Sequence, residues 1–235
     1  MKNLLSEHAS KYEELHGRCK FSCDYVDSRD ITSKEVLDIG CGFGWFEMYA
    51  LRDSPSCIVG IEPEAKNLQA ARESIHDPRA GFQVGSALDL PFQPNSFDTV
   101  VCWEVLEHLP VRTEPALFDE VYRVLSPGGS FYLSTPYRSL VGTVSDPAWW
   151  LIGHRHYRTE ELIALAEGAG LRIQSSTVRG GTFQAIGTLN MYIAKWVFRR
   201  KPIFQSFFEV REDAEHQREG FMTLFVKMAK PANAD

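Results

Sequence analysis

The chain has 235 residues, a formal net charge of −6 and 44% hydrophobic residues. This length suits one large domain with a sizeable core, and the acidic balance disfavours nucleic acid as a partner. Five cysteines, without paired metal-ligand spacing, predict neither a disulfide framework nor a zinc site. Residues 1–18 lack the apolar centre of a signal peptide, and no apolar run is long enough to span a bilayer, so a cytoplasmic protein is expected.

Residues 1–33 are polar with apolar side chains at roughly helical spacing, which predicts one or two helices laid over the core. The apolar run 36–39 then predicts a buried strand, and a helix is expected over 45–52. Between them stand Gly40, Gly42 and Gly44, which allow a sharp turn and close approach of a ligand. Strand, glycine loop and helix form the first half of a nucleotide-binding unit, although an ordinary strand-to-helix turn shows the same pattern.

Further strands are expected to alternate with helices along the chain. The strands cover 57–61, 80–84, 97–102, 130–134, 171–178 and 220–229, and helices are expected over 64–74, around 117–125 and over 159–167. This alternation predicts an α/β fold with a doubly wound, mostly parallel seven-stranded sheet and helices on both faces. Because no crossover helix is evident before the last strand, we expect that strand to be antiparallel.

A single domain over 1–235 is expected, with cover helices in 1–33, a ligand-binding core in 34–178, an insertion in 179–217, and a final strand and tail in 218–235. The insertion mixes many aromatic residues with the basic cluster 199–201. One interpretation is a helical segment that packs on the core with its basic end in water. The other is a lid over an apolar or amphipathic acceptor, or a membrane-surface patch.

Two acidic residues stand at the ends of successive predicted strands, Asp38 in the first and Glu62 at the end of the second. Either carboxylate alone would be interpreted as a solvated loop group. At the carboxyl edge of a parallel sheet, however, the two lie side by side where such folds bind ligands. Glu62 offers two acceptor oxygens to a ribose diol. The segment 86–88, after the third strand, would lie beside an adenine.

A dinucleotide and S-adenosylmethionine compete as the ligand. A dinucleotide fingerprint needs a third glycine, and the two places where it could stand hold Trp45 and Glu47. Trp45 is bulky, and the Glu47 carboxylate would repel a phosphate. S-adenosylmethionine has no phosphate and carries a cationic sulfonium, which acidic and aromatic residues suit better.

The chain resembles the class I S-adenosylmethionine-dependent methyltransferases, and among them the small-molecule branch of the ubiquinone-biosynthesis O-methyltransferases. The segments that carry the resemblance, in the order of that family, are 36–44, 60–63, 90–92, 96–101, 107–109, 123–129, 159–162 and 169–171. The resemblance implies that Gly40 and Gly42 line the methionine part of the cofactor, that Asp38 lies near its ammonium group, and that Glu62 holds the ribose. Family members often carry Asp where this chain has Ser86, which weakens the contact with adenine.

The full cofactor-binding set that we expect is Asp38, Gly40, Cys41, Gly42, Gly44, Glu62, Pro63, Ser86, Ala87 and Trp103. Methyl transfer is a direct displacement at the sulfonium methyl, so the enzyme mainly aligns the acceptor and excludes water. No covalent nucleophile is needed. Cys41 is therefore interpreted as a loop residue and not as a catalytic thiol.

Glu104, Glu107 and His108 follow the fourth predicted strand and would share one face of a helix. His108, with Glu107 beside it, is the expected catalytic base for a substrate hydroxyl. The same spacing resembles a metal-binding pattern of some ubiquinone-pathway and small-RNA 2′-O-methyltransferases, with His154 and His156 as downstream ligands of a divalent ion. Plain hydrogen-bonding groups at a helix start are the alternative, so the metal is left undecided.

The function predicted is S-adenosylmethionine-dependent transfer of a methyl group to a small-molecule acceptor, with a hydroxyl oxygen favoured over carbon or nitrogen. The Asn-Pro-Pro-Tyr pattern of methylases that act on amide or base nitrogens is absent around Pro136. A non-catalytic S-adenosylmethionine-binding regulator and a Rossmann-type oxidoreductase are the alternatives. The sequence does not identify the acceptor or the oligomeric state.

Overall fold

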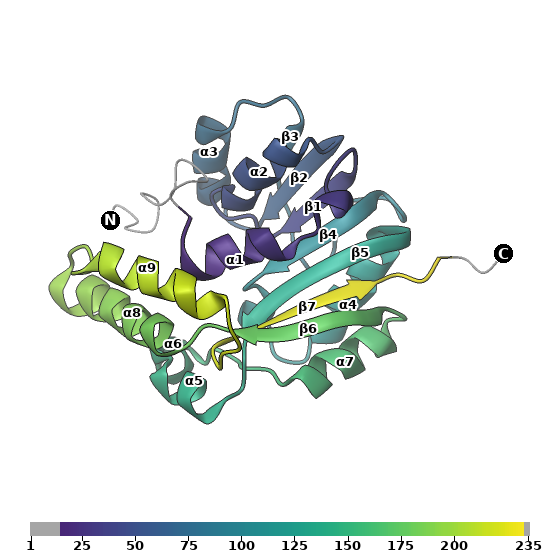
Figure 1. Cartoon of the computed structure of the whole chain (residues 1–235). Coiled ribbons are helices and arrows are strands. Elements are labelled where there is room, and N and C mark those ends of the chain that lie inside the picture. Colours follow the sequence, from purple (N-terminus) through teal and green to yellow (C-terminus); the bar gives the residue numbers. More distant parts are fainter. Residues whose placement is uncertain (1–14, 233–235) are drawn as a thin grey trace.

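The computed structural model describes residues 15–232 and shows one sheet flanked by helices (Figure 1). The sheet has the strand order β3-β2-β1-β4-β5-β7-β6. Its strands are β1 (Glu35–Ile39), β2 (Cys57–Glu62), β3 (Ala80–Val84), β4 (Phe97–Trp103), β5 (Leu125–Pro136), β6 (Arg172–Arg179) and β7 (Thr223–Ala229). The predicted doubly wound α/β fold is therefore confirmed.

The strand order reverses direction between β1 and β4, which are parallel neighbours. Ligands bind at such a switch point, outside the carboxyl ends of the strands. The last strand, β7, pairs antiparallel with both β5 and β6, as predicted, although helices over 182–193 and 205–216 lie between β6 and β7 where no crossover helix was expected. Strand β7 lies between β5 and β6, so β6 and not β7 forms the edge of the sheet.

Two apolar layers hold the helices on opposite faces of the sheet. The helices α1 (Gly17–Tyr25) and α2 (Trp45–Ala50) cover one face, with α3 (Ala65–Ser74) beside α2. The other face carries α4 (Glu114–Val124) and α7 (Thr159–Gly168). In α4 the buried side chains recur at helical spacing, which is why this segment folds as a helix against the sheet; they are Leu117, Phe118, Val121 and Val124.

Short 3-10 turns connect some of these elements: η2 (Ser28–Asp30), η3 (Leu51–Asp53) and η4 (Leu106–His108). The predicted cover over 1–33 is described only in part. Helix α1 packs in the core layer beside α2, whereas the predicted helical positions within 1–14 lie outside the described residues. Among the described helices, none is both long and apolar enough to cross a membrane.

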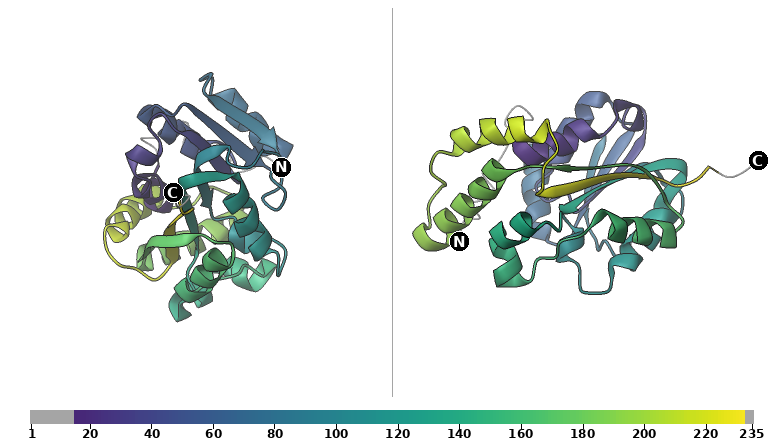
Figure 2. Two further views of the ribbon diagram at one scale, coloured as in Figure 1. Left: turned by 90° about the vertical axis from the view of Figure 1, so that its right-hand side faces the viewer. Right: turned by 60° about the horizontal axis from the view of Figure 1, so that its bottom comes forward.

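The predicted insertion is helical, and it lies beyond the carboxyl ends of the parallel strands (Figures 1 and 2). It consists of α8 (Thr182–Ile193), a π-helical turn η5 (Ala194–Phe198) and α9 (Gln205–His216). Two further short helices, α5 (Leu140–Ser145) and α6 (Pro147–Ile152), follow β5 and lie below α8 in Figure 1. Helix α9 also contacts α1, so the insertion packs against the first described helix.

One buried carboxylate joins α8 to α9. Glu215, 5% exposed near the end of α9, accepts hydrogen bonds from the backbone N–H groups of Gly181 (3.1 Å), Phe183 (2.9 Å) and Gln184 (3.1 Å). These donors form the N-terminus of α8, where unpaired N–H groups and the helix dipole favour a negative charge. The carboxylate therefore fixes the start of α8 from a neighbouring helix.

We expect Glu215→Ala to lower the free energy of unfolding by about 1–3 kcal/mol, the cost of leaving buried donors unsatisfied. Amide exchange at the start of α8 should accelerate more than exchange in β1. Glu209→Ala is the control, because Glu209 in the same helix accepts only from Gln205 among the described contacts. Equal effects of both substitutions on stability and exchange would contradict this role.

Candidate active site

The glycine loop adopts left-handed backbone at all three glycines, with φ of 78° at Gly40, 54° at Gly42 and 82° at Gly44. A Cβ on Gly40 would lie 2.3 Å from the side chain of Val105, so this position has no room for one. A Cβ on Gly42 would meet nothing within 4 Å among the described atoms. The loop is thus closely packed at Gly40 and open at Gly42, as a ligand cradle requires.

Asp38 and Glu62 lie on neighbouring strands at this edge, as predicted. Asp38 is 1% exposed, and it pairs in register with Gly60 of β2 and Val101 of β4. Glu62 ends β2 and is partly exposed. Its Oε2 accepts from the N–H of Gly42 (3.3 Å) and its Oε1 from the side chain of Asn67 (3.1 Å). The buried Asp38 therefore lies beneath the glycine loop, and Glu62 lies beside it.

A third acid, Glu47, belongs to the same group. It lies in the first turn of α2 and is fully buried, and a Cβ on Gly60 would come within 2.3 Å of its Oε1. The four carboxyl oxygens of Asp38 and Glu47 are buried without a hydrogen-bond partner among the described residues. The sequence pattern indicated Glu47 only as a group that repels phosphate. An acid inside an otherwise apolar helix start was the available signal.

Burial sets the protonation of this pair. Desolvation, together with the Glu62 charge, raises the pKa of Asp38 to about 8. Desolvation and the neighbouring Asp38 raise the pKa of Glu47 well above its usual range. Because like charges cannot both ionise in a buried site, the pair holds a proton at neutral pH until a cation compensates it.

The remaining predicted cofactor residues are divided between surface and core. Pro63 and Ser86 are exposed, and the Ser86 hydroxyl accepts from the N–H of Leu88 (3.2 Å). The side chains of Cys41, Ala87 and Trp103 are at most 9% exposed. Burial raises the pKa of the Cys41 thiol, so the thiol is neutral and no nucleophile. Any ligand contact of Cys41 and Ala87 therefore comes mainly from their backbone.

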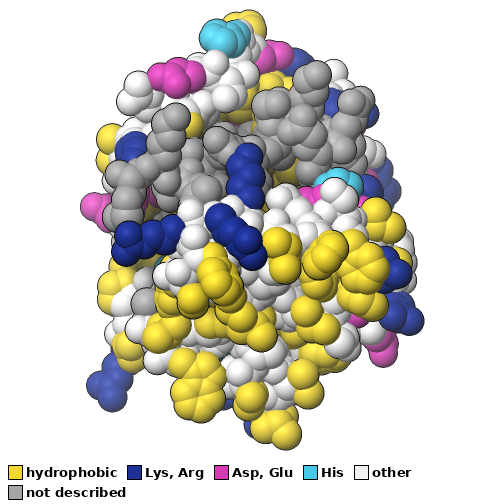
Figure 3. Space-filling view, turned by 90° about the vertical axis from the view of Figure 1, so that its left-hand side faces the viewer, with side chains coloured by type: hydrophobic (Ala, Val, Ile, Leu, Met, Phe, Trp, Pro, Cys, Tyr) yellow, Lys and Arg dark blue, Asp and Glu magenta, His cyan; other side chains and the backbone are white. Residues whose placement is uncertain are grey.

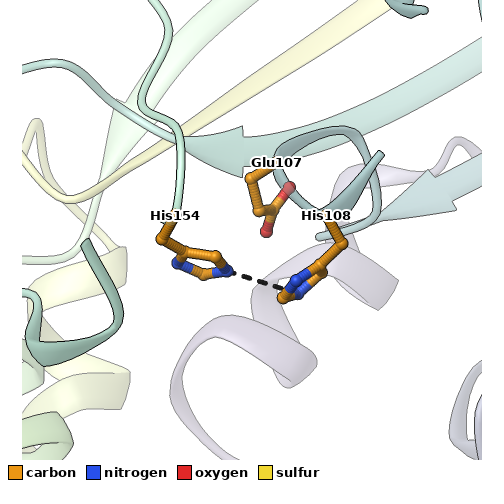
Figure 4. A group of neighbouring side chains, drawn as sticks. All are labelled: Glu107, His108 and His154. Carbon is orange, nitrogen blue, oxygen red and sulfur yellow. Dashed lines mark hydrogen bonds between the residues drawn. The ribbon is translucent and has the colours of Figure 1, made fainter. Parts of the chain in front are cut away.

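A second cluster follows β4, where His108 and His154 face each other with 3.3 Å between their Nε2 atoms (Figure 4). Glu107, 3% exposed, lies beside them, and its Oε2 accepts from the Thr135 hydroxyl (3.1 Å). Burial, followed by the neighbouring His154, lowers the pKa of His108. The His108 ring is therefore neutral at neutral pH and can accept a proton.

The predicted single helix face for Glu104, Glu107 and His108 is wrong. Glu104 has left-handed backbone (φ 55°), and only the 3-10 turn η4 follows. Its carboxylate accepts from the hydroxyl of Ser134 (2.8 Å) and from the guanidinium of Arg18 (2.7 Å). Glu104 thus links α1 and β5 to this edge, and it lines the same cavity as the two histidines without a described hydrogen bond to either.

Asp146, which sequence reasoning missed, orients the histidines. Its Oδ2 bonds to Nδ1 of His154 (3.0 Å) and to Nε2 of His156 (2.9 Å), and its Oδ1 accepts from the N–H of Ala148 (2.9 Å). We infer that His154 carries its proton on Nδ1, which leaves the Nε2 lone pair facing His108. His156 is 5% exposed and supports Asp146 from behind. The position of Asp146 in the sequence gave no signal beyond that of an ordinary N-cap of α6.

These side chains line a cavity of about 390 Å³. Glu107, His108 and His154 form one wall, and Gln184, Met191 and Tyr192 of α8 form another. The cavity therefore places polar groups that can move a proton opposite a helix face on which Met191 and Tyr192 stand beside the polar Gln184 and Thr188. A pocket with a few convergent polar groups and apolar walls suits a small organic acceptor.

The same cluster has the donor set of a divalent metal site. Ligand atoms of Glu107, His108 and His154 lie within 4.8 Å of one another. The Oε1 atom of Glu107 is buried and finds no partner in the described part of the chain. Asp146 behind His154 is the carboxylate–histidine arrangement that orients metal-binding imidazoles. Of the ligands predicted from sequence, Glu104 and His156 do not join this set.

Comparison with known proteins places this geometry in a family. Residues 36–129 match the profile of a methyltransferase domain. The chain is 31% identical over 174 residues to a ubiquinone biosynthesis O-methyltransferase of Xanthomonas euvesicatoria, covering 68% of this chain and 72% of that protein. It belongs to the class I S-adenosylmethionine-dependent methyltransferases. The resemblance seen in the sequence is confirmed, and the oxidoreductase alternative is set aside.

More distant members of this methyltransferase family agree. The chain is 37% identical over 108 residues to a chloroplastic tocopherol O-methyltransferase of Arabidopsis thaliana, 43% of this chain but only 30% of that protein. A solved S-adenosylmethionine-dependent methyltransferase of Mesorhizobium loti superposes with a TM-score of 0.62 at 20% identity, covering 85% of this chain and 92% of that one. The fold is shared along nearly the whole chain, although the sequences have diverged.

We expect the stabilising contribution of the buried pair Asp38 and Glu47 to fall as pH rises from about 4 to about 8. Asp38 and Glu47 have folded-state pKa values raised above their ordinary values, so the folded protein keeps protons that the unfolded chain releases in this window. Glu47→Gln removes one of the two acids. The free energy of unfolding of the variant should fall less over this range, on a scale of about 1.4 kcal/mol per pKa unit removed.

Denaturant unfolding at a series of pH values measures this difference. Glu73→Gln is the matched control, because Glu73 is an exposed acid on α3. A pH dependence of Glu47→Gln identical to that of the parent protein and of Glu73→Gln would show that the buried pair does not hold the proton.

Proposed function

We propose that this methyltransferase transfers the methyl group of S-adenosylmethionine to a hydroxyl oxygen of a small apolar or amphipathic molecule. The observation that carries the proposal is the pair of facing histidine Nε2 atoms at the wall of the cavity, with Asp146 behind one of them. Two relatives named as O-methyltransferases, of ubiquinone biosynthesis and of tocopherol, support oxygen as the acceptor atom.

The cofactor would lie across the glycine loop at the carboxyl ends of β1 and β2. Its ammonium group would compensate the buried charge of Asp38 and Glu47, which have no other partner in the described structure. Glu62, already within reach of the Gly42 N–H, would accept the ribose hydroxyls. The segment 86–88 would face the adenine. Cys41 and Gly44 shape the loop, and Pro63 and Trp103 border it.

The reaction would be a single displacement. A lone pair of the acceptor oxygen forms a bond to the methyl carbon, the carbon–sulfur bond breaks, and its electrons remain on sulfur as the neutral thioether product. The hydroxyl proton would pass to the neutral imidazole of His108. Because the His154 Nε2 is the acceptor of the 3.3 Å contact, the His108 Nε2 donates there and its Nδ1 is the nitrogen left to take the proton. Glu107 would orient the acceptor beside them.

A divalent ion at Glu107, His108 and His154 would supply Lewis-acid activation of the same hydroxyl. The donor set fits such an ion, as described above. The base and the metal assignments use the same side chains, so the experiment on His108 has to distinguish them.

We also infer that residues 179–217 act as a lid, as one interpretation of the sequence held. Helix α8 contributes a wall of the cavity, and α9 fixes the start of α8 through Glu215. The lid would open for acceptor and close against water. Exchange of α8 amides as slow as that of β1 and β4, in the measurement designed for Glu215, would contradict it and favour the packed insertion.

A non-catalytic S-adenosylmethionine-binding regulator is the second candidate. It would share the glycine loop and Glu62 but would not need paired imidazoles in a cavity. An assay of methyl transfer distinguishes the two functions. It uses S-adenosylmethionine with a labelled methyl group and extracts of small molecules as the source of acceptors.

We expect Glu62→Ala to weaken S-adenosylmethionine binding by about 1–3 kcal/mol, the scale of hydrogen bonds to a charged group. Titration calorimetry measures the Kd directly. Glu64→Ala is the control, because this exposed acid two residues further on makes no side-chain cap. An unchanged Kd in Glu62→Ala would remove Glu62 from the cofactor site.

We expect His108→Ala to lower kcat by about 10²–10⁴-fold, the contribution of a general base, while the Kd for S-adenosylmethionine stays nearly unchanged. His76→Ala is the control, because His76 is an exposed histidine that follows the end of α3. Full turnover in His108→Ala would contradict the assignment.

Titration of the chelator-treated protein with Mn²⁺, followed by paramagnetic resonance, tests the metal separately from activity. Binding that is lost in His108→Ala and His154→Ala would support the metal assignment. Full activity after exhaustive chelation would leave His108 as the base alone.

A further inference from the structure

Exposed apolar side chains are concentrated on one face of the molecule. Of the large hydrophobic residues exposed in the described part of the chain, all but Val84 and Val111 lie in two segments, 140–151 and 186–210. We call them the apolar face: Leu140, Val141, Val144, Trp149, Trp150 and Leu151 from α5 and α6, and Ile186, Leu189, Ile193, Trp196, Val197, Phe198, Ile203, Phe204, Phe207 and Val210 from α8, η5 and α9. Patches of this extent mark interaction sites.

Figure 3 shows this side of the molecule, with yellow side chains gathered over its lower half and dark-blue ones along their upper border. The segment 180–208 holds Lys195, Arg199, Arg200 and Lys201 and no acidic residue, although the chain as a whole carries a net charge of −6. Positive charge and exposed apolar surface therefore occur together in this segment, whereas the chain as a whole is acidic.

The backbone presents these groups outward. The π-helical turn η5 ends at Phe198 and is followed by Arg199. Arg199 and Phe204 both have left-handed backbone, with φ of 50° and 55°. Phe204 is 74% exposed. Such conformations cost energy in non-glycine residues, and the turn they form directs an aromatic side chain and adjacent cations into solvent.

We propose that the apolar face docks on an anionic lipid bilayer. Aromatic and aliphatic side chains enter the boundary between headgroups and acyl chains, and basic side chains beside them attract anionic headgroups, which is the pattern of proteins that lie on a membrane without crossing it. A second copy of this chain fits less well, because a two-fold contact would bring the basic clusters of the two copies together, and Glu209 is the one acid in the segment 186–210.

The docked face is the outer side of the cavity wall. Tyr192 lines the cavity and packs edge-on against Trp196 of the apolar face, with 5.1 Å between the ring centroids. This step rests on the proposed function: docking would let an amphipathic acceptor pass from the bilayer into the cavity along α8. The inference therefore specifies where the acceptor resides, in a membrane of anionic lipid.

Co-sedimentation of the full chain with extruded vesicles tests the docking, without cofactor or acceptor. We expect binding to vesicles of phosphatidylcholine with phosphatidylglycerol, weaker binding to phosphatidylcholine alone, and loss at high salt. Arg199→Gln with Arg200→Gln should weaken binding by about thirty-fold, and Val197→Ser with Phe204→Ser should weaken binding to both lipids.

Matched controls lie outside the apolar face. They are Val84→Ser with Val111→Ser for the apolar pair and Lys66→Gln with Arg112→Gln for the cations, all exposed positions. Absence of binding to the anionic vesicles at low salt, equal loss in controls and test variants, or a dimer that Phe204→Ser dissociates would each overturn the proposal.

Failure here is distinguishable from failure of the proposed function. A chain that binds vesicles but methylates no hydroxyl contradicts only the reaction, and a chain that methylates a soluble hydroxyl compound but ignores anionic vesicles contradicts only the docking.

Discussion

Desolvation of the Asp38 carboxyl is the constraint on which the cofactor side of the molecule depends. The carboxyl lies in the middle of the sheet, between β2 and β4, where an isolated negative charge is costly. No described residue donates to it, and Glu47 adds a second buried acid over Gly60. The site must therefore hold a proton or bind a cation. A cofactor with an ammonium and a sulfonium meets this need, whereas a pyrophosphate would increase the cost.

Local sequence patterns were sufficient for the sheet and for this constraint. Short apolar runs between turn signals predicted all seven strands, and the glycines with Asp38 and Glu62 predicted the switch-point site, because parallel strands bring their carboxyl ends together. The antiparallel last strand was predicted as well, although the premise was wrong, because the helices α8 and α9 do lie between β6 and β7. The position of β7 between β5 and β6 was not predicted, because pairing partners depend on long-range register.

The second cluster shows where local patterns fail. A helical spacing placed Glu104 beside His108, but left-handed backbone at Glu104 directs its carboxylate to Arg18 and Ser134 instead. Conversely, Asp146 enters the site from the segment after β5. No periodicity connects positions so distant in the chain, and only packing of α1, α6 and η4 on one sheet edge reveals which groups meet.

Helix α8 connects the candidate active site with the apolar face. Its inner side completes the cavity opposite the histidines, and its outer side continues into the apolar face. The apolar residues on the outer side stay in water and do not stabilise α8 as a surface helix. Glu215 and the packing against α9 hold it in place from the N-terminus. The exposed side is then the remaining apolar surface, and coverage by lipid at this side would place the entrance of the cavity at the membrane surface.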